Sequence, residues 1–285
     1  MIRMIATDID GTLINDQGII TPQTRKALIA AQEKGIRLVI ATGRSPQYTR
    51  AEQEQLEMQR FTGDYIIALN GQEIFRFSDH STWTGRKIPA GSIPDVLKLA
   101  FEYDLEALCY DGGSRYHYLP PDFYAKKEAW LRRFPSLAPT DFESILGERI
   151  SLPSWNSSFD NDINKIAFLH SAPRLREVLP LVRRRLPSGL QALLVKPTWL
   201  EIFPAEINKG GALGQIMEET GIQPDEVLAF GDGENDIGML KSVTFGFAMG
   251  NAFPSVKEAA CAVTASNNCD GIARVVNALC LTHSA

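Results

Sequence analysis

Short apolar runs alternate with capped helices over the first third of the chain. Apolar, β-rich runs occupy residues 2–7, 36–41 and 65–69. We expect a helix between the first two runs, because Thr21 and Pro22 form a typical helix start and Gly35 a typical helix end. Strands that are separated by single helices predict parallel βαβ units with right-handed crossovers.

A different pattern follows this segment. The apolar run at residues 73–77 comes directly after Asn70 and Gly71, which predicts a hairpin with the run before it. From about residue 81 to residue 204 the runs come in adjacent pairs, 105–110 with 115–119 and 191–196 with 199–203. Helices and a loop rich in Pro, Ser and Asn (135–164) lie between the pairs. Strands that pair through turns predict an antiparallel sheet with helices, an α+β module.

The alternating pattern returns after Lys209. A helix to Gly221, a run at 227–230, a helix to Leu240, a run at 244–248 and a closing helix at 271–281 follow one another. The predicted fold class is therefore α/β, a doubly wound and mostly parallel sheet with an inserted α+β domain. Residues 1–83 and 206–285 would form the core, and residues 84–205 the insertion.

Length, composition and charge narrow the class of protein. The chain has 285 residues, of which 44% are hydrophobic and 22% charged, as expected for two globular domains. The formal net charge of -5 disfavours a nucleic-acid partner. No apolar run reaches membrane-spanning length and no basic-then-apolar leader opens the chain, so we expect no membrane contact and a cytoplasmic location. The four cysteines lie far apart and indicate neither a zinc site nor a disulfide framework.

Two carboxylates follow the first apolar run. Asp8 and Asp10 stand two residues apart, and Gly11 comes directly after them. Like charges this close raise each other's pKa unless a cation compensates. Mg²⁺ prefers oxygen ligands, and open α/β sheets bind ligands at the carboxyl ends of their strands. The motif therefore predicts a metal site, against the alternative of an acidic surface turn.

Three further polar motifs follow predicted strands or open a predicted helix. Thr42, Gly43 and Arg44 follow the second run, and the segment 231–236 follows the run 227–230. Lys209 opens a helix, where backbone N–H groups favour anions. The simpler interpretations are a helix N-cap turn, a solvated acidic loop and a solvated lysine. However, three acids and an amide within five residues after a buried strand would cost free energy unless they bound a cation.

Taken in order, the four motifs resemble those of the haloacid dehalogenase superfamily of phosphohydrolases. The resemblance covers nearly the whole chain, and the insertion between the second and third motifs looks like the larger cap type. Further segments are similar to the Cof-like sugar-phosphatase branch: Asn70-Gly71, 200–202, 248–252 and Asp270-Gly271. The chain departs from the family pattern at Ile9, where Leu is commoner, and lacks the glycine often found at 205–208.

The resemblance implies a role for each motif residue. Asp8 would be the nucleophile that forms an aspartyl-phosphate, and Asp10 the general acid and then the general base. Thr42 and Lys209 would complete the catalytic set. The residues implied for Mg²⁺ are Asp8, Asp10 through its backbone carbonyl, Asp232, and Asp236 through a water or by orienting Lys209. The residues implied for substrate binding are Gly43, Arg44, Asn70, Gly71 and Asn235.

The implied activity is Mg²⁺-dependent hydrolysis of a phosphomonoester, with a small phosphorylated metabolite such as a sugar phosphate as substrate. A phosphotransferase or mutase with the same chemistry is an alternative, and a non-catalytic protein that binds a phosphate ligand is another. The inserted domain would be a cap that reads the leaving group, and the protein a monomer or a homodimer. Residues that could line the cap's binding surface, or instead form its core, are Tyr110, Arg115, Tyr116, His117, Tyr118, Lys196 and Trp199.

Overall fold

The chain divides into two compact units. The computed structural model describes residues 1–111, 114–120 and 150–281. Met1–Arg86 and Glu206–Ala285 form one unit, here called the core unit, and Lys87–Ala205 form the inserted unit. The sequence places the first boundary at residue 83, three residues earlier. The difference arises because the strand β5 (Thr82–Thr84) pairs with the sheet of the core unit.

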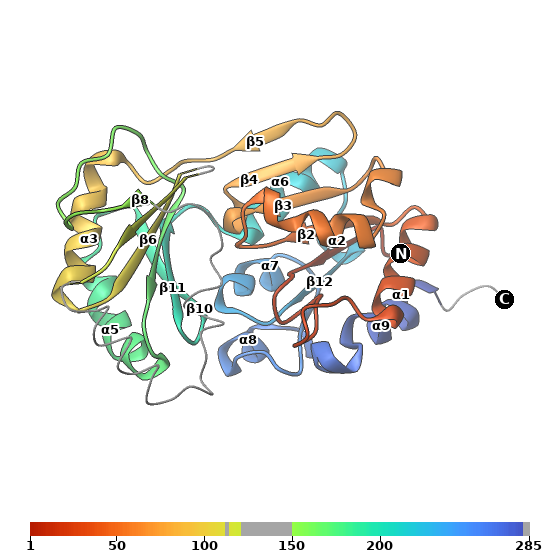
Figure 1. The fold of residues 1–285 in the computed structure, drawn as a ribbon. Coiled ribbons are helices and arrows are strands. Elements are labelled where there is room, and N and C mark those ends of the chain that lie inside the picture. Colours follow the sequence, from red (N-terminus) through yellow and green to blue (C-terminus); the bar gives the residue numbers. More distant parts are fainter. Residues whose placement is uncertain (112–113, 121–149, 282–285) are drawn as a thin grey trace. The chain divides into compact units, whose positions relative to one another are not determined.

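The core unit is built on one mixed sheet, in the strand order β14-β13-β12-β1-β2-β3-β4-β5 (Figure 1). The parallel strands are β1 (Met4–Thr7), β2 (Arg37–Ala41), β3 (Tyr65–Ala68), β12 (Val227–Gly231), β13 (Phe245–Ala248) and β14 (Ala262–Val263). The antiparallel strands are β4 (Glu73–Arg76) and β5. All residues of β1 and β12 are buried, as expected for strands at the centre of a parallel sheet. The doubly wound, mostly parallel sheet predicted from the sequence is therefore present.

The helices of the core unit begin and end close to the signals in the sequence. The helix α1 (Pro22–Glu33) is capped by Thr21, whose side chain accepts a hydrogen bond from Thr24 N, and α1 packs beside α9 (Gly271–Val276) (Figure 1). The remaining α-helices of this unit are α2 (Arg50–Gln55), α6 (Lys209–Thr220), α7 (Ile237–Lys241) and α8 (Pro254–Ala259). The predicted closing helix continues beyond α9 as a short π-helix, Asn277–Leu281.

The inserted unit has its own sheet, in the order β10-β11-β9-β6-β7-β8. Its strands are β6 (Glu106–Asp111), β7 (Ser114–Tyr118), β8 (Ile150–Ser151), β9 (Lys165–Leu169), β10 (Leu190–Lys196) and β11 (Trp199–Pro204). Both predicted hairpins, β6 with β7 and β10 with β11, are antiparallel. The sequence did not predict β9, which lies between the hairpins and pairs with strands distant in the chain. The part of the predicted loop at 135–149 lies outside the described residues.

One face of the inserted sheet packs against the helices α3 (Ile93–Glu102) and α5 (Ala172–Arg185) in a hydrophobic cluster. Tyr118 belongs to this cluster and Tyr116 packs against it. The opposite face carries buried charged groups, among them Glu106, which lies 2.6 Å from Nε2 of His117. Candidates from the sequence that share this opposite face include Tyr110, Arg115, His117 and Trp199.

No helix among the described residues is long and apolar enough to cross a membrane.

The close crossing of α6 and α7 depends on Gly210. A Cβ atom at this position would lie 2.4 Å from the carbonyl oxygen of Gly238. We expect Gly210→Ala to lower the free energy of unfolding by about 1–3 kcal/mol, because rigid backbone would have to move. Gly214→Ala in the same helix is the matched control: its Cβ would meet nothing within 4 Å, so it should stabilise the protein by about 0.5–1 kcal/mol. Urea denaturation of both variants measures the difference, and equal destabilisation would contradict the packing explanation.

Asp64 makes the stability of the core unit depend on pH. Its Oδ1 accepts a hydrogen bond from Leu38 N at 2.8 Å, while Oδ2 is buried without a hydrogen-bond partner among the described residues. Burial raises the pKa of Asp64 to about 7 from an ordinary value of 3.8. The folded state therefore keeps a proton that the unfolded chain releases, and stability falls as the pH rises between these two values.

We expect the wild type to lose up to about 3 kcal/mol more free energy of unfolding than Asp64→Asn between about pH 5 and about pH 8. The Asn side chain stays neutral and keeps the acceptor for Leu38 N. Urea denaturation at several pH values measures the two slopes. Parallel curves for the two proteins would show that Asp64 does not titrate in this range.

Candidate active site

The parallel strands bring three polar motifs to one edge of the core sheet. β1 pairs in parallel with β2 on one side and with β12 on the other. Asp8, Thr42 and Asp232 follow directly after these three strands. The backbone N–H of Asp8 continues the pairing by donating to Phe230 O at 3.1 Å. The carboxyl ends of the central strands thus hold the three residues side by side, as the sequence pattern predicts.

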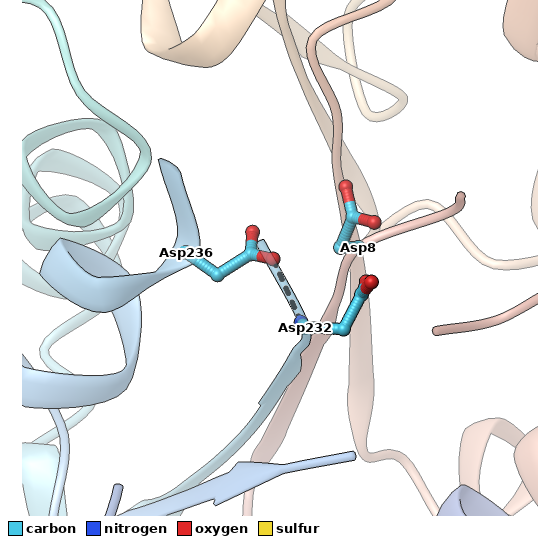
Figure 2. Close-up of side chains that lie close together, drawn as sticks. All are labelled: Asp8, Asp232 and Asp236. Carbon is cyan, nitrogen blue, oxygen red and sulfur yellow. Dashed lines mark hydrogen bonds between the residues drawn. The ribbon is translucent and has the colours of Figure 1, made fainter. Parts of the chain in front are cut away.

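Three carboxylates form a tight cluster at this edge (Figure 2). One oxygen each of Asp8, Asp232 and Asp236 lies within 4.8 Å of the others. Asp8 and Asp236 are buried and Asp232 is half-buried. Oxygen donors of this kind are the ligands that Mg²⁺ prefers, and the cluster is the one group of potential metal ligands found among the described residues.

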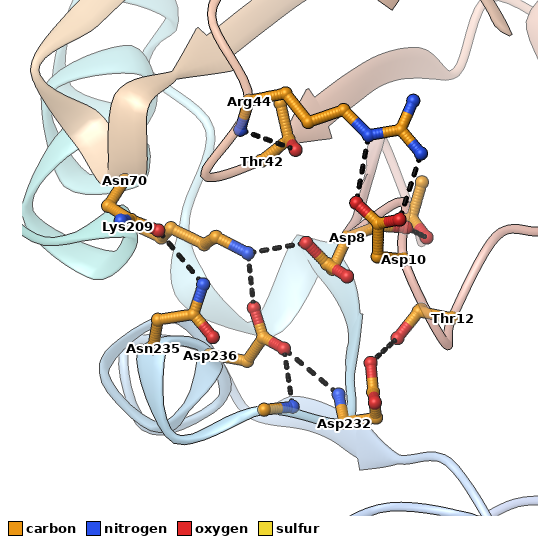
Figure 3. Close-up of polar contacts among 12 residues, drawn as sticks. Asp8, Asp10, Thr12, Thr42, Arg44, Asn70, Lys209, Asp232, Asn235 and Asp236 are labelled. Atoms are coloured by element: carbon orange, nitrogen blue, oxygen red, sulfur yellow. Dashed lines mark hydrogen bonds and ion pairs between the residues drawn. The ribbon is translucent and has the colours of Figure 1, made fainter. Parts of the chain in front are cut away.

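Lys209 lies fully buried between two of these carboxylates (Figure 3). Its Nζ donates to Asp8 Oδ1 and to Asp236 Oδ1, both at 2.6 Å. The residue is the first of α6, whose N-cap is Asn208; the Asn208 side chain accepts from Gly211 N at 2.8 Å. The helix start therefore directs the ammonium group into the carboxylate cluster, rather than into solvent.

Oδ2 of Asp236 stabilises the loop at residues 231–236. Asp236 Oδ2 accepts from the backbone N–H groups of Asp232 and Gly233, each at 2.9 Å. Gly231 is required beneath this carboxyl group, because a Cβ there would lie 2.4 Å from Asp236 Cβ. Because Oδ1 accepts from Lys209 Nζ, both carboxylate oxygens of Asp236 have hydrogen-bond donors within the protein.

Thr12 orients Asp232, a contact that sequence reasoning missed. The Thr12 hydroxyl donates to Asp232 Oδ1 at 2.7 Å, and Thr12 is 1% exposed. Between Asp10 and Thr12, Gly11 adopts a φ of +80°, and a Cβ there would lie 2.4 Å from Asp232 Oδ2. The position of Thr12 two residues after Asp10 is the signal that could have identified it, since the turn at Gly11 brings it back to the site.

The electrostatics of the cluster favour an added cation. Burial raises the pKa of the Asp8 carboxyl well above its ordinary value; Lys209 opposes the rise, and Asp236 and Asp232 add to it. Burial, with the charge of Asp236, also raises the pKa of Asp232 to about 7. Burial disfavours the charge of Lys209, but Asp236 and Asp8 outweigh this and hold its pKa above its ordinary value. Three carboxylates share one ammonium group, so the donor set and its surplus negative charge fit a divalent cation.

Asp10 lies in a different environment from Asp8. Its carboxylate is paired with the Arg44 guanidinium in a two-bond fork, with Nε to Oδ2 at 2.8 Å and Nη2 to Oδ1 at 2.9 Å. The Asp10 side chain is 32% exposed. The same motif thus supplies one buried carboxylate that is paired with a lysine and one partly exposed carboxylate that is paired with an arginine (Figure 3).

The other predicted residues lie around this centre. Thr42 is 1% exposed, and its hydroxyl accepts from Arg44 N at 3.1 Å. Asn70 is joined to the site from two sides: its N–H donates to Thr42 O at 2.9 Å and its Oδ1 accepts from Asn235 Nδ2 at 2.9 Å. Gly43 lies against Asn70, since a Cβ at Gly43 would be 3.0 Å from Asn70 Oδ1.

Gly71 has a packing role in addition to any contact with substrate. Its φ is +106°, and a Cβ there would lie 2.4 Å from the carbonyl oxygen of Asn208, the residue before Lys209. Gly71 therefore allows the turn after β3 to touch the start of α6. Its place in the sequence, after Asn70, predicted a turn but not this contact.

Comparison with known proteins identifies the family. A model of the haloacid dehalogenase-like hydrolases matches residues 5–276. The 5-amino-6-(5-phospho-D-ribitylamino)uracil phosphatase YcsE of Bacillus subtilis is 31% identical, over 96% of this chain and 94% of the relative. The pyridoxal phosphate phosphatase YbhA of Escherichia coli is 26% identical, over 96% and 97%.

Solved structures agree with this result. The crystal structure of a haloacid dehalogenase-like hydrolase from Bacteroides thetaiotaomicron is similar with a TM-score of 0.75 at 30% identity, over 98% of this chain and 100% of that one. The match extends over both units, as the resemblance of the sequence motifs predicts. The chain therefore belongs to the haloacid dehalogenase-like hydrolase family and is a phosphatase of that family.

Proposed function

We propose that the chain is a Mg²⁺-dependent phosphomonoester hydrolase that acts through a phosphorylated Asp8. The observation that carries the proposal is the ammonium group of Lys209, buried at 2.6 Å from both Asp8 and Asp236. It fixes the orientation of the Asp8 carboxylate and favours its ionised form, the form that attacks phosphorus. It also lowers the repulsion between that carboxylate and an incoming phosphate dianion.

Asp8 and Asp232 would hold Mg²⁺ through their carboxylates, and the family resemblance adds the backbone carbonyl of Asp10. When bound, the ion neutralises the phosphoryl oxygens and the developing charge. Asp236 acts by orienting Lys209 and the loop, because both of its oxygens are already engaged. Thr12 holds Asp232 in position with its hydroxyl group.

The remaining residues serve the two half-reactions. Asp10 donates a proton to the leaving oxygen and then accepts one from the water that attacks the phosphorylated Asp8. The hydroxyl of Thr42 and the N–H groups around Gly43 bind the phosphoryl oxygens. Asn70 and Asn235, which bond to each other, support that side of the site.

The substrate is a small phosphorylated metabolite, a sugar phosphate or similar compound. The printed names of the two curated relatives, a phosphoribitylamino-uracil phosphatase and a pyridoxal phosphate phosphatase, support this class. The inserted unit would be the cap that reads the leaving group, using the sheet face opposite α3 and α5 with Tyr110, His117 and Trp199. A cytoplasmic location and a monomeric or homodimeric state remain part of the proposal.

We expect the wild type to release inorganic phosphate from at least one member of a panel of sugar phosphates, nucleotides and pyridoxal phosphate when Mg²⁺ is present. EDTA should abolish the release because Asp8 and the phosphate would then repel each other. Asp8→Asn should lower kcat by at least about 10⁴-fold, since it replaces the attacking carboxylate by a neutral amide that is not a nucleophile.

The control for this panel is Asp225→Asn, which removes an exposed acid outside the site and should keep full activity. Folding of every variant is checked by circular dichroism. Substrate consumption without phosphate release would favour the phosphotransferase or mutase. A folded protein that binds Mg²⁺ and consumes no compound of the panel would favour the non-catalytic alternative.

We expect Asp232→Asn to weaken Mg²⁺ binding by about 10–100-fold or more, because it removes a charged ligand but keeps the acceptor for Thr12. Isothermal titration calorimetry with MgCl₂ measures the affinity. Asp225→Asn should bind Mg²⁺ like the wild type. Unchanged affinity in Asp232→Asn would remove this residue from the proposed metal site.

A further inference from the structure

The Arg44 guanidinium has nearly all of its hydrogen-bonding capacity committed within the core unit. Nε and Nη2 donate to the two oxygens of Asp10, and Nη1 donates to Tyr48 O at 3.1 Å and to Glu52 Oε1 at 2.9 Å. Its own backbone is also held, because its carbonyl accepts from Leu69 N at 3.0 Å. Hydrogen-bond partners on three sides fix the orientation of this planar group. The two bonds to Asp10 therefore fix the position of the Asp10 carboxylate as well.

Glu52 is the unusual member of this set. Its side chain is 7% exposed, and its Oε2 is buried without a hydrogen-bond partner among the described residues. A buried carboxylate costs free energy unless it is paired, and Arg44 is the partner that the structure gives it. The neighbouring acid on α2, Glu54, differs from Glu52 in its exposure and in its partner: it is exposed and pairs with Arg50 one helical turn away.

We infer that Glu52 is a positioning residue that acts through Arg44 to hold the Asp10 carboxylate in place for proton transfer. The inference rests on the proposed function, because it takes Asp10 as the general acid. It also changes the role of Arg44, which the sequence resemblance assigns to substrate binding. Glu52 and Arg44 would touch no substrate, and their effect would be confined to the two proton transfers that need Asp10.

Proton transfer is sensitive to such positioning. A general acid must come within hydrogen-bond distance of the leaving oxygen, and an error of about 1 Å can cost about 100-fold in rate. Glu52→Gln keeps the size of the side chain but replaces the ion pair with Nη1 by a weaker hydrogen bond to an uncharged amide oxygen. The guanidinium is then held less firmly, and Asp10 gains rotational freedom.

Two aryl phosphates separate this role from a structural or substrate-binding role. Phenyl phosphate has a poor leaving group that requires protonation, whereas the nitro group of p-nitrophenyl phosphate lets the phenolate leave without a proton. The kcat/KM value covers the steps from substrate binding to phosphoryl transfer. It therefore includes the acid role of Asp10 but not its later role as a base. Both compounds are measured with Mg²⁺ for the wild type, Glu52→Gln, Asp10→Asn and the double variant, and Glu54→Gln is the matched control.

We expect Glu52→Gln to lower kcat/KM about 10-fold for phenyl phosphate and no more than about twofold for p-nitrophenyl phosphate. In the Asp10→Asn background the same substitution should cause no further loss, because the two residues act on one step. Glu54→Gln should match the wild type with both compounds.

Equal losses of kcat/KM on the two compounds would overturn the inference. Should Glu52→Gln fail to fold, as judged by circular dichroism, Arg44→Lys carries the same test, because it keeps the charge but removes the fork. If Asp10→Asn shows no dependence on the leaving group, the proposed role of Asp10 fails and the inference fails with it. If Asp10→Asn shows the dependence while Glu52→Gln and Arg44→Lys do not, the inference fails alone.

Discussion

One buried ammonium group connects the two chain segments of the core unit. Asp8 belongs to the segment before the inserted unit, and Lys209 and Asp236 belong to the segment after it. Nζ of Lys209 lies 2.6 Å from an oxygen of each carboxylate, and no part of the Lys209 side chain is exposed. Burying any of these charges without its partners would cost several kcal/mol. The three residues therefore depend on one another, and the site can form only when both segments have folded together.

The four carboxylates of the site differ in their exposure and in their hydrogen-bond partners. Asp8 is buried against an ammonium group, while Asp10 is partly exposed and lies in the Arg44 fork. Asp236 has both oxygens engaged, and Asp232 is oriented by the Thr12 hydroxyl. The site can thus hold the proposed nucleophile, proton carrier, metal ligand and orienting group close together, because the partners of each carboxylate differ.

Much of this arrangement could be predicted from local sequence signals. The apolar runs at residues 2–7, 36–41 and 227–230 predicted parallel strands, and polar motifs after them predicted a site at one sheet edge. The strand β9 was missed because it pairs only with strands distant in the chain, and β5 and β14 because they are short and exposed. Thr12 and Glu52 were missed for a related reason: their roles depend on side-chain contacts that periodicity does not reveal.

The proposed mechanism requires that Asp8 carries the phosphoryl group during turnover. The direct measurement is rapid acid quenching of the enzyme with Mg²⁺ and a cleaved substrate, followed by proteolysis and mass spectrometry. The proposed mechanism predicts one phosphorylated peptide, with the modification on Asp8, that forms and decays at rates consistent with kcat. Phosphate on another residue, or turnover without any phosphorylated peptide in the wild type and without a trapped intermediate in Asp10→Asn, would contradict it.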